Sequence, residues 1–126
     1  MLPVERVIGE GGLVASPDGL RLDVRLPWYR SLPLSTVEVE RLEIDGEAVA
    51  PEALRFELDG ASWSLAELAE QTNAFWFVLD SAQLLVPGRM AAPGATLRVA
   101  LTINLYPPYI PGMKRSNQQV ETLRVQ

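Results

Sequence analysis

The sequence predicts an all-β fold, an antiparallel β-sandwich with one short helix, in a chain of 126 residues. Three observations predict this class. Apolar and polar residues alternate over residues 20–26 and 97–105, which is typical of strands with one buried face. Turn signals separate the short strands, namely SPDG at residues 16–19 and Asp-Gly at residues 45–46 and 59–60. A helical signal occurs once, so short strands with turns between them favour a sandwich.

The first half of the chain reads as strands between turns. GEGG at residues 9–12 lacks the strand and helix that flank a phosphate-binding loop, so we expect an ordinary loop there. Residues 20–26 form a strand, and a second strand over residues 37–44 changes its alternation at residues 40–41, which indicates a β-bulge. A third apolar face is formed by Leu54, Phe56 and Leu58.

The second half begins with the helical signal. Ser64 and Glu67 have the spacing of a capping box, so we expect a helix of about two turns over residues 64–71. FWF at residues 75–77 returns to an extended segment, and QVETLRV at residues 119–125 is the last strand. No repeat or long linker divides the chain, so we expect a single domain over residues 1–126.

Composition excludes several classes of function. The chain has neither cysteine nor histidine, so Ser-His-Asp and Cys-His catalysis and any His- or Cys-ligated metal site are excluded. A net charge of −5 without a basic stripe argues against nucleic-acid binding. The apolar runs are too short to span a bilayer, and the start has no signal-peptide pattern, so we expect no membrane association and a cytoplasmic location.

Two proline-rich aromatic segments each follow a strand and are the main candidates for a binding surface. LPWYRSLPL at residues 26–34 carries Trp28, Tyr29 and Arg30. The segment NLYPPYIPGMKRSN at residues 104–117 carries Tyr106, Tyr109, Ile110, Met113, Lys114 and Arg115. Prolines fix φ, so such loops display apolar side chains at a small entropic cost, and Trp, Tyr and Arg are typical interface anchors. The alternative interpretation is structural: both segments tuck under or wrap over the end of the sandwich.

Carboxylates do not form the pairs in an apolar setting that hydrolytic acid–base chemistry needs. Most lie at outward-facing strand positions or in turns, where solvent accounts for them. Asp80, which follows FWFVL, is the one acid in a strongly aromatic context and is therefore the single acid–base candidate.

Four segments in a fixed order carry a family resemblance. They are GLRLDVRLPWYRSLPLSTVEVERLEIDGEAV (19–49), LRFELDGASWSLAEL (54–68), FWFVLDSAQLLV (75–86) and YPPYIPG (106–112). Together they resemble the small β subunit of bacterial C-glycoside deglycosidases, including the R-x-P-x-Y-R crossover followed by PLS. The loop at residues 106–112 has more prolines than the family's I-P-Y loop.

The resemblance implies a heteromeric enzyme. A larger α subunit, a TIM barrel, would hold a divalent metal, usually manganese, and the acid–base residues. The substrate would be a 3-keto C-glycoside, whose ketone acidifies the neighbouring C–H so that the aglycone can leave by elimination. This chain would then contribute no catalytic residue and no cofactor. It would stabilise the α subunit and shape the active-site mouth with the residues of the two aromatic segments.

Two other hypotheses remain open at this point. One is a free-standing carbohydrate-binding module that uses Trp28 and Tyr109 as stacking platforms. The other is an assembly subunit that does not touch the substrate.

Overall fold

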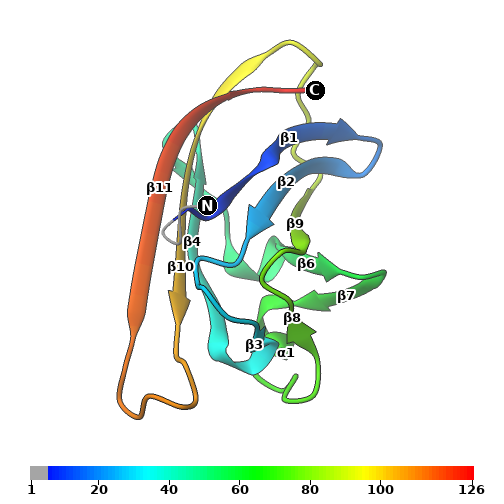
Figure 1. Cartoon of the computed structure of the whole chain (residues 1–126). Helices are drawn as coiled ribbons and strands as arrows, with labels where there is room; N and C mark the ends of the chain where they lie inside the picture. The colour runs from blue at the N-terminus through cyan, green and yellow to red at the C-terminus, as the bar shows by residue number, and fades with distance from the viewer. Residues whose placement is uncertain (1–5) are drawn as a thin grey trace.

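Two antiparallel sheets face each other in the computed structural model, which describes residues 6–126 (Figure 1). The all-β prediction is confirmed. One sheet has the order β1-β2-β9-β6-β7, the other has the order β11-β10-β4-β5, and β3 pairs with β8. The elements are β1 (Ile8–Ser16), β2 (Gly19–Arg25), β3 (Leu32–Pro33), β4 (Val37–Ile44), β5 (Glu47–Ala48), β6 (Arg55–Leu58), β7 (Ala61–Ser64), α1 (Leu65–Leu68), β8 (Phe75–Trp76), β9 (Ser81–Pro87), β10 (Thr96–Leu105) and β11 (Arg115–Arg124), with 3₁₀ turns at Leu34–Thr36 and Pro51–Ala53.

The core lies between the two sheets and follows the predicted alternation. β2 contributes Leu20, Leu22 and Val24, all with no exposed surface, while the facing strand β10 contributes inward apolar residues such as Leu101. At one end of the core the rings of Phe56 and Trp76 meet edge to face, with centroids 5.3 Å apart. Each of these large side chains stabilises the fold by roughly 1.5–3 kcal/mol through burial.

The bulge predicted in the second strand is present in β4. Arg41 pairs with Thr102 of β10 and Val39 pairs with Ile103, so Glu40 is the extra residue on β4. Because of this insertion, the side chains of Glu38 and Glu40 both lie on the outer face of the sheet, beside the C-terminal end of β10.

The two Asp-Gly turns also have the predicted geometry. Asp45 and Asp59 each have φ of 51°, and the glycines that follow each have φ of 82°. Positive φ at both central residues is the arrangement that two-residue hairpins require.

The prediction of a loop at residues 9–12 is wrong, because these glycines lie inside strand β1. The register of β1 with β2 is irregular between Ile8 and Leu13, and the Asp23 carboxylate lies against this part of β1. A Cβ at Gly9 would lie 2.3 Å from Asp23 Oδ2, and the Gly11 N–H donates to the same oxygen at 2.8 Å. The glycines therefore admit a neighbouring side chain rather than forming a loop.

The helix is shorter than predicted. The capping box between Ser64 and Glu67 is formed, but α1 ends at Leu68. Beyond it the bonds change to the i→i+3 type, from the Glu70 and Gln71 N–H groups to the carbonyls three residues earlier.

The segment FWFVLDSAQLLV forms two strands, β8 and β9. The chain turns between β8 and β9, where the Asp80 N–H donates to the Phe77 carbonyl at 2.9 Å. Trp76 is fully buried, and its indole N–H donates to the Asp80 carbonyl at 2.8 Å. The residues on either side of Trp76, Phe75 and Phe77, face away from the core and are exposed.

The loop before β10 and the loop after it lie at opposite ends of this ten-residue strand (Figure 1). Residues 88–95 form the first loop, and residues 106–114 join β10 to β11. In the part of the chain that the structure describes, no helix has the length and apolarity needed to cross a membrane.

Candidate functional site

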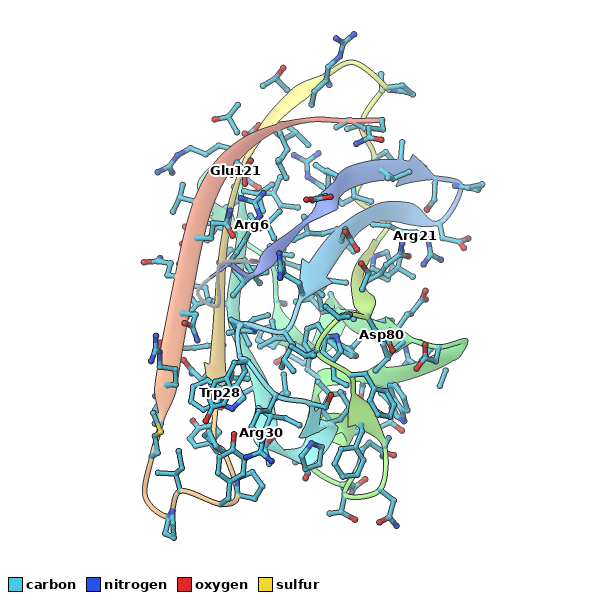
Figure 2. All side chains as sticks on the ribbon, in the orientation of Figure 1. Arg6, Arg21, Trp28, Arg30, Asp80 and Glu121 are labelled. Atoms are coloured by element: carbon cyan, nitrogen blue, oxygen red, sulfur yellow. The ribbon has the colours of Figure 1, made fainter. Side chains whose placement is uncertain are left out.

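The two proline-rich aromatic segments meet at one end of the sandwich. Trp28 follows β2, Tyr109 lies in the β10–β11 loop, and the Trp28 indole N–H donates to the Tyr109 hydroxyl. The Arg30 guanidinium carbon lies 5.1 Å from the centroid of the Tyr109 ring, within cation–π distance. Figure 2 shows Trp28 and Arg30 at the end of the molecule where this loop turns. The two segments, separated by about half of the sequence, thus form one surface.

Most of the predicted residues of this surface are exposed. Tyr29 is 58% exposed, Tyr109 is 44% exposed, and Tyr106 and Ile110 are exposed to a similar or slightly smaller degree. Trp28 differs, because it is buried and retains 7% of its exposure. It packs against Tyr29, with ring centroids 4.9 Å apart, and supports both loops from beneath. A buried ring does not offer a face for a sugar to stack on.

The remaining predicted residues lie where the loop joins β11. Met113 is partly buried against the core. Lys114 is exposed, with its Nζ 3.9 Å from Glu40 Oε1. Arg115 is the first residue of β11 and is partly exposed. These three residues therefore lie at the margin of the surface that the two aromatic segments form. That they contact a partner or a substrate stays a prediction.

Sequence analysis missed one part of this surface. β8 pairs with β3, which lies within the Trp28 segment, and the Val78 N–H donates to Ser31 Oγ at 3.0 Å. This pairing brings the exposed side chains of Phe75, Phe77 and Leu79 beside it; Phe77 is 57% exposed. The sequence predicted only an extended segment here. The signal for exposed side chains is the pair of aromatics flanking a single tryptophan, because alternate residues of a strand face opposite sides. We call Tyr29, Tyr109, Ile110, Phe75, Phe77 and Leu79 the aromatic end.

A polar cluster fixes the start of the β10–β11 loop. Asn104, the penultimate residue of β10, has no exposed surface. Its Nδ2 donates to Glu38 Oε1 at 2.7 Å and to Glu40 Oε1 at 2.9 Å. The Tyr106 hydroxyl donates to the same Glu38 oxygen at 2.9 Å. Because Glu40 reaches this position only through the bulge, the bulge in β4 helps to set the direction in which the loop leaves the sheet.

These contacts shift two pKa values in opposite directions. The hydrogen bond from Asn104 lowers the pKa of Glu38, with help from the Tyr106 hydroxyl and the Lys114 charge, while partial burial opposes the shift. The hydrogen bond to Glu38 raises the pKa of Tyr106, because the phenol must keep its proton to donate it.

The cluster predicts an acid-dependent loss of stability. A carboxylate with a lowered pKa in the folded state stabilises the fold fully above its unfolded value of 4.5, and this contribution disappears as the pH falls through the lower folded value. We expect Glu38→Gln to be less stable than the wild type near neutral pH and the difference to shrink below about pH 4.5. Denaturant unfolding at a series of pH values measures this, with Glu47→Gln, at an exposed position of β5, as the control for net charge. A difference that is independent of pH would contradict the assignment.

A groove opens beside the cluster. It has a volume of about 700 Å³ and lies between β4 and α1. Its lining is largely apolar, from residues such as Val37, Val39 and Leu65, with Glu38 and Tyr106 at its margin. Tyr106 thus links the groove to the loop that carries Tyr109 and Ile110 of the aromatic end.

Asp80, the acid–base candidate, lies beside Leu79 at the margin of the aromatic end. It is partly exposed and lines a shallow hollow with Asp23 and Arg25, beside the start of β9. Its main structural contact is made by its backbone, which holds the Trp76 indole.

Comparison with known proteins identifies the family. The model of a family described as "C-glycoside deglycosidase beta subunit" matches residues 8–109, which is most of the chain. The chain belongs to this family. The match spans the Trp28 segment, most of the core and the first half of the β10–β11 loop, and it ends at Tyr109. The resemblance seen in the sequence is confirmed.

Curated relatives agree with this assignment. The chain is 40% identical to the 3'-dehydrocarminate deglycosidase beta subunit of a Microbacterium species over 118 residues, which covers 94% of this chain and 89% of the relative. It is 38% identical to a C-glycoside deglycosidase beta subunit of Microbacterium trichothecenolyticum over 110 residues, covering 87% and 82% of the two chains. A third relative with the same description, from Arthrobacter globiformis, is 40% identical over 90 residues, covering 71% and 68%.

Proposed function

We propose that this chain is the non-catalytic beta subunit of a cytoplasmic heteromeric C-glycoside deglycosidase. Its aromatic end binds the catalytic alpha subunit, and part of the adjoining loop lines the mouth of the active site. The observation that carries this proposal is the membership of the beta-subunit family together with an exposed aromatic end on a rigid base. Large exposed apolar patches on small domains mark interaction sites.

The geometry of the aromatic end supports a protein partner. Tyr29, Phe77 and Tyr109 are well exposed, while Trp28 and the polar cluster hold the loops of Tyr29 and Tyr109 from below. A preorganised surface loses little conformational entropy when it binds. Arg30 at the edge and Lys114 at the loop base provide the charged rim that is typical around apolar interface cores.

The chemistry belongs to the partner in this proposal. Cleavage of a 3-keto C-glycoside requires a base that removes the proton beside the ketone and a cation or donor that stabilises the enolate. The C–C bond to the aglycone then breaks as a sugar C=C bond forms, and the departing aglycone carbon takes up a proton. Within residues 6–126, no three side chains of Asp, Glu, His or Cys gather as metal ligands. We therefore assign the divalent metal and the base to the TIM-barrel alpha subunit and derive no step through a metal here.

The aglycone of a C-glycoside is typically a flat phenol, and the surface next to the loop suits it. Tyr106 and Tyr109 offer aromatic faces, and Ile110 offers an apolar side chain. If the loop reaches the active-site mouth, these residues contact the aglycone rather than the sugar, which leaves the sugar to the metal and the base.

Reconstitution tests this proposal. The isolated chain should not cleave a 3-keto C-glycoside, and adding the alpha subunit should restore turnover that the alpha subunit lacks alone. Chelation should abolish this turnover but leave the melting temperature of the isolated chain unchanged, since the metal lies in the other subunit. An alpha subunit that is fully active alone would contradict the proposal. Millimolar or tighter binding of simple sugars to the isolated chain would instead support a carbohydrate-binding module.

A further inference from the structure

β11 is a long strand with one open edge. It pairs with β10 over all ten of its residues, and within residues 6–126 no strand pairs with its other side. Figure 1 shows it as the outermost strand of its sheet. Beyond the strand, Gln126 exchanges backbone hydrogen bonds with Leu13 and Ala15 of β1. Along the strand, β11 meets the start of β1 through side chains, because Gln119 Oε1 accepts from the Val7 and Ile8 N–H groups. Residues 115–124 therefore present a row of unused backbone donors and acceptors.

The other sheet edges are protected in ways that β11 is not. β1 is irregular, while β5 and β7 are two and four residues long. The sequence of β11, RSNQQVETLR, contains no proline, glycine or lysine. Its Val120 is 46% exposed on the outer face of the sheet. Natural edge strands of this length normally carry blocking features unless they pair with another chain.

We propose that β11 pairs with β11 of a second copy of this chain, antiparallel about a two-fold axis through Gln118, so that two four-stranded sheets join into one.

The backbone restricts the possible registers. Successive residues of a strand point their N–H and C=O groups to opposite sides. The Val125 N–H bonds to Ala95, toward β10, and the Gln126 N–H bonds to β1 on the other side. The backbone N–H and C=O groups of the even-numbered residues of β11 therefore point to the open edge. When two antiparallel strands pair about a two-fold axis, the backbone N–H and C=O groups of two directly opposite residues must both point to the shared edge or both point away from it. Opposed residues are therefore an even number of positions apart, and the axis passes through a residue.

Charge selects one of these registers. An axis through Gln118 places Arg115 opposite Glu121 of the other copy, twice by symmetry. An axis through Gln119 would instead oppose Lys114 and Arg124, which repel, and an axis through Asn117 or Val120 would oppose no pair of charges. Opposite charges directly across antiparallel strands are stabilising, and like charges are destabilising.

The two charged groups are available for this contact. Arg115 has no ion pair among the described residues. Glu121 contacts Arg6 at 3.4 Å and Gln119 at 2.8 Å, and Figure 2 shows Arg6 and Glu121 side by side next to β11. Both contacts use Oε2, so the other carboxylate oxygen can accept a guanidinium from across the edge. In the same register Val120 lies opposite Ser116, which covers part of its exposed surface.

Charge exchange across the interface tests the proposal with the full chain. In sedimentation velocity over a wide range of concentration, the wild type should show a monomer–dimer equilibrium. Arg115→Glu and Glu121→Arg should each raise the dimer dissociation constant about tenfold or more, because each places like charges opposite one another twice. An equal mixture of the two variants should dimerise again, since each mixed pair opposes a carboxylate and a guanidinium.

Arg124→Glu is the matched control, because it makes the same change at the other end of β11, where this register opposes Gly112. It should leave the dissociation constant within about twofold of the wild type. Amide exchange of the wild type gives a second measurement, in which protection at residues 116–120 should rise with concentration. A wild type that stays monomeric, a mixture of folded variants that stays monomeric, or equal weakening by Arg124→Glu would each overturn the proposal.

Discussion

Replacing Asn104 with Asp is expected to lower the free energy of unfolding by about 3–5 kcal/mol at neutral pH. The wild-type amide has no exposed surface and donates both of its bonds to carboxylates, Glu38 and Glu40. A carboxylate in its place removes both donors and puts a third negative charge beside the other two. Burying an uncompensated charge is costly, so the introduced group should take up a proton or unfold the end of β10. Denaturant unfolding by circular dichroism measures the loss.

Asn117→Asp is the matched control for this substitution. Asn117 is also buried, at 5% exposure, but its amide donates to the Arg115 carbonyl rather than to carboxylates. The loss there should be smaller, and it should recover less as the pH is lowered. Equal losses at the two positions would show that the carboxylates are not the cause, and the account of the polar cluster would then be wrong.

Tyr109→Ala is expected to weaken binding of the alpha subunit by roughly 1–3 kcal/mol, the usual effect of losing an interface anchor. The substitution removes an exposed ring that Trp28 and Arg30 hold in place. If the ring touches the substrate, KM should also rise. The acid–base profile of kcat should not change, because the proton-transfer groups are proposed to lie in the partner. Isothermal titration calorimetry measures the binding.

Met90→Ala provides the comparison for Tyr109→Ala. Met90 is 57% exposed in the loop at the opposite end of β10. The Met90→Ala substitution therefore also removes a large exposed side chain, but at a position away from the aromatic end. It should leave the affinity unchanged. If Tyr109→Ala instead melted the isolated chain while the complex kept normal affinity and kinetics, the loop would be a lid over the core and not an interface.

Local patterns predicted most of the sandwich. Alternation alone found β2 and β10, the phase change at residues 40–41 found the bulge in β4, and the Asp-Gly pairs found two hairpins. These features depend on neighbouring residues, so one sequence carries the signal. The error at residues 9–12 has a non-local cause. Those glycines make room for Asp23 of the adjacent strand, and sequence spacing cannot distinguish this use of glycine from a loop.

The candidate site was predicted only in part, because local patterns mark its loops but not the contacts between distant residues. Prolines and aromatics marked the two loops, and their position after strands suggested that they meet, as Trp28 and Tyr109 do. The polar cluster was missed because Asn104 and Glu38 are 66 residues apart and meet only through the pairing of β4 with β10. Phe77 was missed because an apolar run looks the same whether it fills a core or covers a turn.

Amide hydrogen exchange of this chain, measured alone and in complex with the alpha subunit, tests the central claim most directly. The account predicts that binding slows exchange in three segments that are distant in sequence, at residues 28–31, 75–79 and 106–114. It predicts no change at residues 88–95, the loop at the other end of β10. Protection confined to residues 88–95 or to the outer face of the β4–β10–β11 sheet, with the aromatic end unchanged, would contradict the account.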